Sequence, residues 1–157
     1  LPGPHTARKK ASVDQQVIDQ KLESLRRCLA RIESKQPFDA DQLADDFDLQ
    51  DIVSLNLTRA VQMAVDIGAH IAASHNRPGP ATMGEIFDQL ASMGVISTDL
   101  GSQLKKSVGF RNIAVHNYST INWQVVHAII ATHLQDFIHF ARAVILWQTQ
   151  KASSPRI

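Results

Sequence analysis

The sequence predicts an all-α protein, an antiparallel bundle of about five main helices and one short helix. Three observations support this fold class. Apolar residues recur at spacings of three and four through most of the chain, which is the period of an amphipathic helix. Residues that cap or break helices separate these periodic stretches. The 157 residues are enough to bury one substantial core, so we expect a single domain.

We expect an arm, one helical domain and a tail. Residues 1–12 contain two prolines and a glycine but no hydrophobic periodicity, which is typical of an expression tag or a disordered arm. Residues 13–151 form the domain, and residues 152–157 form the tail. The arm holds three of the 16 basic residues and none of the 15 acidic ones, so the remainder has 13 basic residues and a formal charge of −2. Any binding of nucleic acid must therefore come from a local patch.

Cysteine content and hydropathy indicate a cytoplasmic protein that does not interact with membranes. The chain has one cysteine, Cys28, which excludes an intramolecular disulfide, and no signal-peptide pattern is present. Cys28 lies on the flank of an amphipathic helix, so we interpret it as structural rather than nucleophilic. No apolar run approaches the roughly 18 residues that a membrane span requires.

The first helix is expected to run from a cap at Ser12 and Gln15 to about Ser34. Its apolar residues follow at spacings of four, three, four and three: Ile18, Leu22, Leu25, Leu29 and Ile32. Its arginines form either a solvated face or a contact surface for RNA phosphate: Arg26, Arg27 and Arg31.

An aspartate-rich segment follows, from Asp39 to Asp51. A calcium loop would need a central glycine and a closing glutamate, and the segment has neither. We predict a short helix from Asp39 to about Phe47 and then a connector, with an acidic docking face for a partner as the alternative.

A long helix is expected from Leu49 to about Ser74, with small residues at Ala60, Ala64 and Gly68 that allow close helix packing. After a loop rich in proline and glycine, residues 82–85 have the spacing of a capping box and predict a third helix that ends at Gly94. Ser97 is expected to start the next helix.

The last helix is expected from about Asn122 to Gln150. Its apolar residues cover so much of the circumference that we expect burial, either in the bundle or against a second subunit. His133, Asp136 and His139 spread over more than one face of this helix, so we predict no metal site and no cofactor.

The segment from Gly109 to Thr120 carries the chemistry. On a helix that turns about 100° per residue, Arg111 falls within an apolar stripe formed by Leu100, Leu104, Val108 and Val115. An arginine is almost never fully buried unless it is paired. Arg111 therefore belongs either to a functional site or to a structural bridge with a carboxylate.

His116 lies roughly 120° around that helix from the apolar stripe. Either the helix ends near Val115 and the chain turns His116 inward, or two copies of the segment meet across an interface. Ser119, Thr120 and Asn122 supply residues that favour a helix stop and a new cap.

Arginine and histidine suffice to cleave RNA through its own 2′-hydroxyl without a metal. Histidine exchanges protons near neutral pH, and arginine stabilises the charge that develops on the phosphate. One histidine does not easily serve as base and acid in the same step, and two copies in a homodimer would supply both.

The pattern Arg111-x4-His116-x-Tyr118 resembles the R-x4-H-x-Y signature of the HepT-like branch of HEPN-domain toxins. The resemblance covers about residues 13–150 and implies a dimeric helical bundle that acts as the toxin of a type II or type VII toxin–antitoxin system. It further implies a metal-independent endoribonuclease with Arg111 and His116 as catalytic residues, and Asn112 and Asn117 as possible supporting residues.

The resemblance also implies a partner, an MNT-type nucleotidyltransferase antitoxin that transfers AMP from ATP to Tyr118 and so silences the toxin. The alternative function is a non-catalytic HEPN-like dimer that binds a nucleotide or regulates the nucleotidyltransferase. Retention of all three motif residues favours the nuclease, and the missing broad basic surface favours the alternative. The sequence does not distinguish mRNA from tRNA as substrate.

Overall fold

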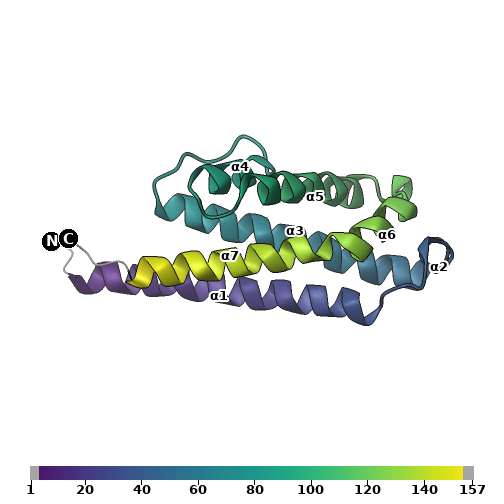
Figure 1. Ribbon diagram of the computed structural model, residues 1–157, viewed down its shortest axis with the longest axis horizontal. Helices are drawn as coiled ribbons and strands as arrows, with labels where there is room; N and C mark the ends of the chain where they lie inside the picture. Colours follow the sequence, from purple (N-terminus) through teal and green to yellow (C-terminus); the bar gives the residue numbers. More distant parts are fainter. Residues whose placement is uncertain (1–3, 154–157) are drawn as a thin grey trace.

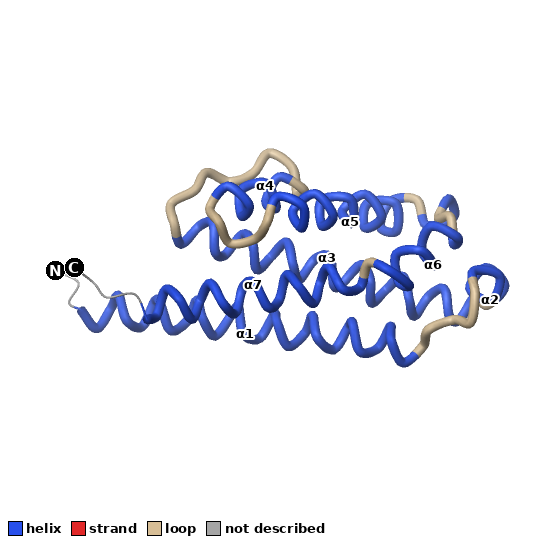
Figure 2. The backbone as a smooth tube through the Cα atoms, in the orientation of Figure 1, coloured by secondary structure: helices blue, strands red, loops and turns tan. Residues whose placement is uncertain are grey.

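The computed structural model describes the backbone of residues 4–153 and the side chains of residues 14–151. Within this part of the chain there are helices and loops but no strand, so the all-α prediction is confirmed (Figure 2). The helices are α1 (Pro4–Ser34), α2 (Ala40–Asp45), α3 (Phe47–Ser74), α4 (Glu85–Ser92), α5 (Thr98–His116), the 3-10 turn η1 (Tyr118–Thr120), α6 (Trp123–Thr132) and α7 (Leu134–Ser153). The division into arm, domain and tail stays a prediction, and residues 1–3 and 154–157 lie outside the described residues.

The long helices α1, α3 and α7 lie side by side and define the length of the molecule (Figure 1). Helices α4 and α5 pack on α3, and α5 also contacts α7. Helix α2 packs against α6 at the end of the molecule opposite to the start of α1 and the end of α7 (Figure 1). The C-terminal end of α5, which carries the Arg111–Tyr118 motif, therefore lies beside α6 at this end.

Close packing in the core depends on aromatic side chains and one glycine. The buried rings of Phe87 and Phe140 meet edge to face, with centroids 6.0 Å apart, a favoured aromatic geometry. A Cβ atom at Gly68 would lie 2.9 Å from Cγ1 of Ile86, so α4 approaches α3 closely because residue 68 has no side chain. Ala60 and Ala64 are also buried, which confirms the predicted role of the small residues in α3.

Several predicted helix ends are confirmed by their hydrogen bonds. The Asp39 carboxylate accepts from the backbone N–H of Gln42 at 2.8 Å and caps α2. Ser97 Oγ accepts from Leu100 N–H at 3.1 Å and caps α5, whereas Gly94, with φ of +80°, follows the end of α4.

Other helix starts differ from the prediction. Helix α1 begins at Pro4 and not at Ser12; proline suits a first turn because no N–H partner is needed there. The connector before α3 is a single residue, Asp46, whose side chain caps α3 through Leu49 N–H. The predicted capping box at residues 82–85 is wrong, because the Glu85 carboxylate accepts from the N–H of Ala81 and the segment forms a turn before α4.

The predicted last helix is two helices, α6 and α7, with a bend of 46° between them. Gln36 Nε2 donates to the carbonyl of Ile130, and Thr132 Oγ1 donates to the carbonyl of Ala128. Such polar insertions into the backbone ladder bend helices, and His133 occupies the break. No helix in the described residues is by itself long and apolar enough to cross a membrane, and α6 and α7 reach that composition only as a bent pair.

Burial of the α6–α7 region is less complete than predicted. Val125, Ile145 and Leu146 are each about half exposed. The bundle does not cover these three side chains. Their burial against a second subunit, the other alternative, stays a prediction.

The isolated cysteine and the arginines of α1 have ordinary structural environments. Cys28 is buried, and burial raises the pKa of its thiol, which agrees with a structural role. Arg26 makes two hydrogen bonds with Glu23, at 2.6 and 2.9 Å, and Arg27 is 3.4 Å from the same carboxylate. Arg26 and Arg27 therefore belong to a solvated, charge-paired face, and the alternative of a contact surface for RNA phosphate that includes the exposed Arg31 stays a prediction.

Candidate active site at the end of α5

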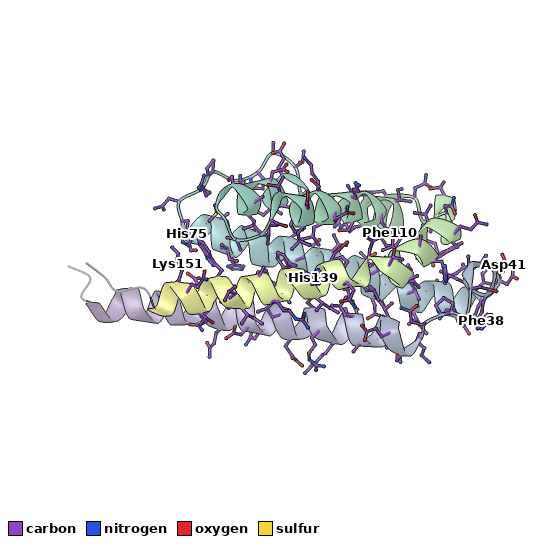
Figure 3. The ribbon with its side chains drawn as sticks, in the orientation of Figure 1. Phe38, Asp41, His75, Phe110, His139 and Lys151 are labelled. Carbon is purple, nitrogen blue, oxygen red and sulfur yellow. The ribbon has the colours of Figure 1, made fainter. Side chains whose placement is uncertain are left out.

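The inward face of α5 differs from the predicted stripe in its last turns. Leu104 and Val108 are buried as predicted, but Phe110 is buried as well, and Val115 is 50% exposed. Phe110 faces α6 and α7, where it lines a groove (Figure 3). The end of α5 therefore projects an apolar residue into solvent beside the motif.

Arg111 is half-buried and has no carboxylate partner among the side chains that the structure describes. Its Nη1 donates to the Asn112 side-chain oxygen at 3.1 Å. Its Nε is buried without a hydrogen-bond partner in the same described region. The alternative of a structural bridge to a carboxylate is thus wrong within the protomer. An unsatisfied buried donor costs about 1–3 kcal/mol.

His116 is the last residue of α5 and is exposed. The backbone N–H of Asn117 makes the last helical bond, to the carbonyl of Ile113 at 2.8 Å, and the helix ends because Asn117 itself leaves the helical conformation, with φ of −153° and ψ of 58°. The chain does not turn His116 inward, so that alternative is wrong within the protomer.

Asn117 shapes the turn that follows. Its carbonyl accepts from Thr120 N–H at 3.0 Å and from Thr120 Oγ1 at 2.8 Å, and its side-chain oxygen accepts from Ser119 Oγ at 3.5 Å. Asn122 then caps α6 by accepting from the N–H groups of Gln124 and Val125. The predicted stop and cap residues are confirmed.

Tyr118 connects this turn to α3. Its hydroxyl donates to Asp51 Oδ1 at 2.7 Å and accepts from Ser54 Oγ at 3.5 Å. Its ring meets that of Trp123 edge to face, with centroids 5.8 Å apart. Burial raises the pKa of Tyr118; the hydrogen bond from Ser54 opposes this rise, and the Asp51 carboxylate adds to it.

Sequence reasoning missed Asp51, Ser54 and Trp123 as members of this site. Asp51 and Ser54 lie 67 and 64 residues before Tyr118, and no local pattern signals contacts at that separation. Asp51 was interpreted only as one member of the aspartate-rich segment.

A largely apolar groove of about 370 Å³ lies next to the motif, between α5, the turn and helices α6 and α7. Its walls include Phe110, Ile113, Val125 and Ile129, and Lys106 contributes to its lining. Ile113 and Val125 are each about half exposed. Val115 is also exposed, but two residues along the helix it projects about 160° away from Ile113, and it does not line the groove.

The three residues weighed as metal ligands in the last helix, His133, Asp136 and His139, do not form a group in the structure. His133 Nδ1 lies 3.0 Å from Asp136 Oδ2, while His139 is exposed farther along α7 (Figure 3). Within residues 14–151, no three potential ligands of the His, Cys, Asp or Glu type are grouped closely enough to hold a metal ion.

A family model described as ribonuclease HepT-like matches residues 25–144, including the whole site. The chain belongs to this family of ribonucleases. Its relatives include the mRNA nuclease HepT of Shewanella oneidensis, 38% identical over 124 residues that cover 79% of this chain and 92% of the relative. The tRNA nuclease HepT of Aphanizomenon flos-aquae is 26% identical over 133 residues, which cover 85% and 90% of the two chains.

A solved structure of the same family supports the fold assignment. The tri-AMPylated HEPN toxin of Shewanella oneidensis, in complex with an MNT antitoxin, is similar with a TM-score of 0.77 and 36% identity, over 83% of this chain and 97% of that chain. The predicted HEPN-like bundle and the family resemblance are confirmed.

Proposed function

We propose that this chain is the toxin of a toxin–antitoxin pair and acts as a metal-independent endoribonuclease through Arg111 and His116. The observation that carries the proposal is the presence of an exposed His116 and a half-buried Arg111 near one helix end of a HepT-like ribonuclease, with no carboxylate bound to that arginine among the described side chains. Two relatives named as RNA nucleases support it.

The proposed reaction uses the RNA 2′-hydroxyl as nucleophile. The 2′-oxygen forms a bond to phosphorus while the bond from phosphorus to the 5′-oxygen breaks, which leaves a cyclic phosphate. One His116 removes the 2′ proton and a second His116 protonates the leaving 5′-oxygen, a role typically worth about 10² to 10⁴-fold each. Arg111 donates to the phosphate oxygens as negative charge increases on them.

Two histidines require two copies of the chain. Ile113 and Val125 are exposed apolar residues that line the groove next to the motif, and such a patch is typical of a protein interface. A homodimer that buries this surface would also bring the two motifs to one cleft. Asn112, which accepts a hydrogen bond from Arg111, and Asn117, which shapes the turn, act as supporting residues.

Regulation is proposed to occur at Tyr118. An MNT-type nucleotidyltransferase transfers AMP to its hydroxyl, and the phosphodiester anion competes with RNA for Arg111 while its bulk fills the cleft. The Shewanella relative, described as tri-AMPylated and bound to an MNT antitoxin, supports this proposal. The proposed location is the cytoplasm.

The alternative function is a non-catalytic dimer that binds a nucleotide or regulates the nucleotidyltransferase. The observation that favours it is the formal charge of −2 outside residues 1–12, which provides no broad attraction for RNA.

An RNA cleavage assay with a chelator present distinguishes the two functions. We expect wild-type protein to cleave mRNA or tRNA, and His116→Ala to lose about 10² to 10⁴-fold in rate. His139→Ala, which removes an exposed histidine from α7, is the matched control and should keep wild-type activity. Wild-type protein that binds its partner but cleaves neither RNA would favour the non-catalytic alternative.

A further inference from the structure

Two side chains of α3, those of Asp51 and Ser54, contact the hydroxyl of Tyr118. Asp51 Oδ1, at 2.7 Å, accepts the phenolic hydrogen, and the one hydrogen of Ser54 Oγ can be donated either to the phenolic oxygen at 3.5 Å or to the backbone carbonyl of Asp51 at 3.4 Å. Ser54 is only 4% exposed, so its hydroxyl has little access to water. The phenolic hydrogen of Tyr118 therefore points toward the Asp51 carboxylate.

The ring is fixed by three elements but is not enclosed. The η1 turn carries Tyr118, α3 holds its hydroxyl, and Trp123 at the start of α6 packs on its ring. The residue is nevertheless 39% exposed, so a second protein can reach it. This arrangement positions a tyrosine for chemistry with an external reagent.

A phenol is a poor nucleophile while it keeps its proton. With an ordinary pKa of about 10, roughly one phenol in 10³ is ionised at neutral pH. Transfer of a phosphoryl-type group to tyrosine therefore benefits from a proton acceptor within about 2.6–3.2 Å of the hydroxyl. Among the residues with described side chains, Asp51 is the carboxylate at that distance from Tyr118.

We infer that Asp51 is the base that takes the Tyr118 proton during AMP transfer, and that Ser54 stabilises the phenolic oxygen as it gains charge. This inference rests on the proposed modification of Tyr118. It assigns a part of the transfer chemistry to the toxin itself, because both residues belong to the chain that is modified.

The step balances without an oxidant or reductant. Tyr118 Oη forms a bond to the α-phosphorus of ATP, and the bond between that phosphorus and the bridging oxygen of the β-phosphate breaks. Pyrophosphate leaves with the electron pair, and the phenolic proton moves to Asp51 Oδ1 and then to water. The modified oxygen carries no hydrogen, so it no longer donates to Asp51.

The test is the rate of AMP addition by the MNT-type nucleotidyltransferase with ATP, followed by intact mass and by peptide mapping of Tyr118. Asp51→Asn keeps an oxygen that accepts the phenolic hydrogen bond but does not take the proton, so we expect a rate about 10²-fold lower. The deficit should shrink at alkaline pH, where the phenol ionises without a base. Asp48→Asn, which removes an exposed carboxylate one turn earlier in α3, should stay within about two-fold of wild type.

Each outcome decides the question. The inference is supported if AMP addition to Asp51→Asn is slow at neutral pH and its rate recovers at high pH. It is also supported if Asp51→Glu is modified faster than Asp51→Asn at equal thermal stability. If wild type is modified on Tyr118 and Asp51→Asn is modified as fast, or Asp48→Asn is equally slow, Asp51 is not the base although the modification stands. If wild type gains no AMP on Tyr118, both the proposed modification and this inference are wrong.

Discussion

Tyr118 and Arg111 show how single residues at this site differ from residues that only build the fold. The buried Nε of Arg111 lacks an acceptor among the described residues, whereas Tyr118 has both an acceptor and a donor at its hydroxyl. A packed core normally satisfies its buried polar atoms. The buried Oε1 of Gln89 in α4 also lacks a partner among the described residues, so the long-range contacts of Tyr118 are the feature that distinguishes the site.

The titration of Tyr118 tests its contacts directly. Tyr118 is the one tyrosine of the chain, so tyrosinate absorbance reports it alone. We expect a pKa above the ordinary value, mainly because of burial; Asp51→Asn should lower that pKa relative to wild type, and Ser54→Ala should raise it. Since the folded pKa is the higher one, the stability that Tyr118 contributes is complete below the unfolded pKa and decreases as pH rises through the folded pKa. An unchanged pKa in Asp51→Asn would contradict the observed contact.

At the scale of helices, a feature could be predicted only where the residues that determine it lie close together in the sequence. The caps at Asp39 and Ser97 were predictable because a cap and its N–H partner lie within three residues. The bend at His133 could not be predicted, because the hydrogen bond that accompanies it joins Gln36 to Ile130, two residues that are 94 positions apart. The site divides in the same way: a local motif predicted Arg111 and His116, and nothing local indicated Asp51.

Two helical glycines test the packing of α3 against α4. At Gly68 a new Cβ would lie 2.9 Å from Ile86 and 3.0 Å from Leu90, whereas at Gly109 in α5 it would meet nothing within 4 Å. We expect Gly68→Ala to lower the free energy of unfolding by about 1–3 kcal/mol through overpacking. Gly109→Ala should raise it by about 0.5–1 kcal/mol because alanine favours helices. Denaturant unfolding measures the free energy of unfolding of both variants. Equal stabilisation by the two substitutions would show that α4 moves to accommodate the new Cβ at residue 68 at no cost in free energy.

At the scale of the whole molecule, the site lies at one end of the bundle, away from the start of α1 and the end of α7 (Figure 1). Helices α5 and α6 bring the motif, the apolar groove and Val125 together there. One protomer thus presents catalytic candidates and an uncovered apolar surface on the same end, which is the arrangement that a shared cleft requires.

Oligomeric state tests this arrangement. We expect a dimer in light scattering or sedimentation, and Val125→Glu should produce a folded monomer with RNA cleavage reduced by at least about 10²-fold, because one His116 is lost from each site. Leu55→Glu is the control and should stay dimeric, since Leu55 is 49% exposed on α3 outside the groove and Val125 is 53% exposed on α6. A monomeric wild type that cleaves RNA, or a Val125→Glu dimer of full activity, would contradict the shared cleft.

The edge-to-face contact between Tyr118 and Trp123 gives the protein an internal fluorescent reporter. The two rings are 5.8 Å apart, so a nucleotide added to Tyr118 changes the surroundings of the Trp123 indole and hence its emission. The other tryptophan, Trp147, packs against His75, with ring centroids 5.7 Å apart, and has Nζ of Lys151 5.1 Å from its ring centroid. Its steady emission provides an internal reference. The modification state of the toxin can then be followed in real time without a label, with Trp123→Phe as the blank.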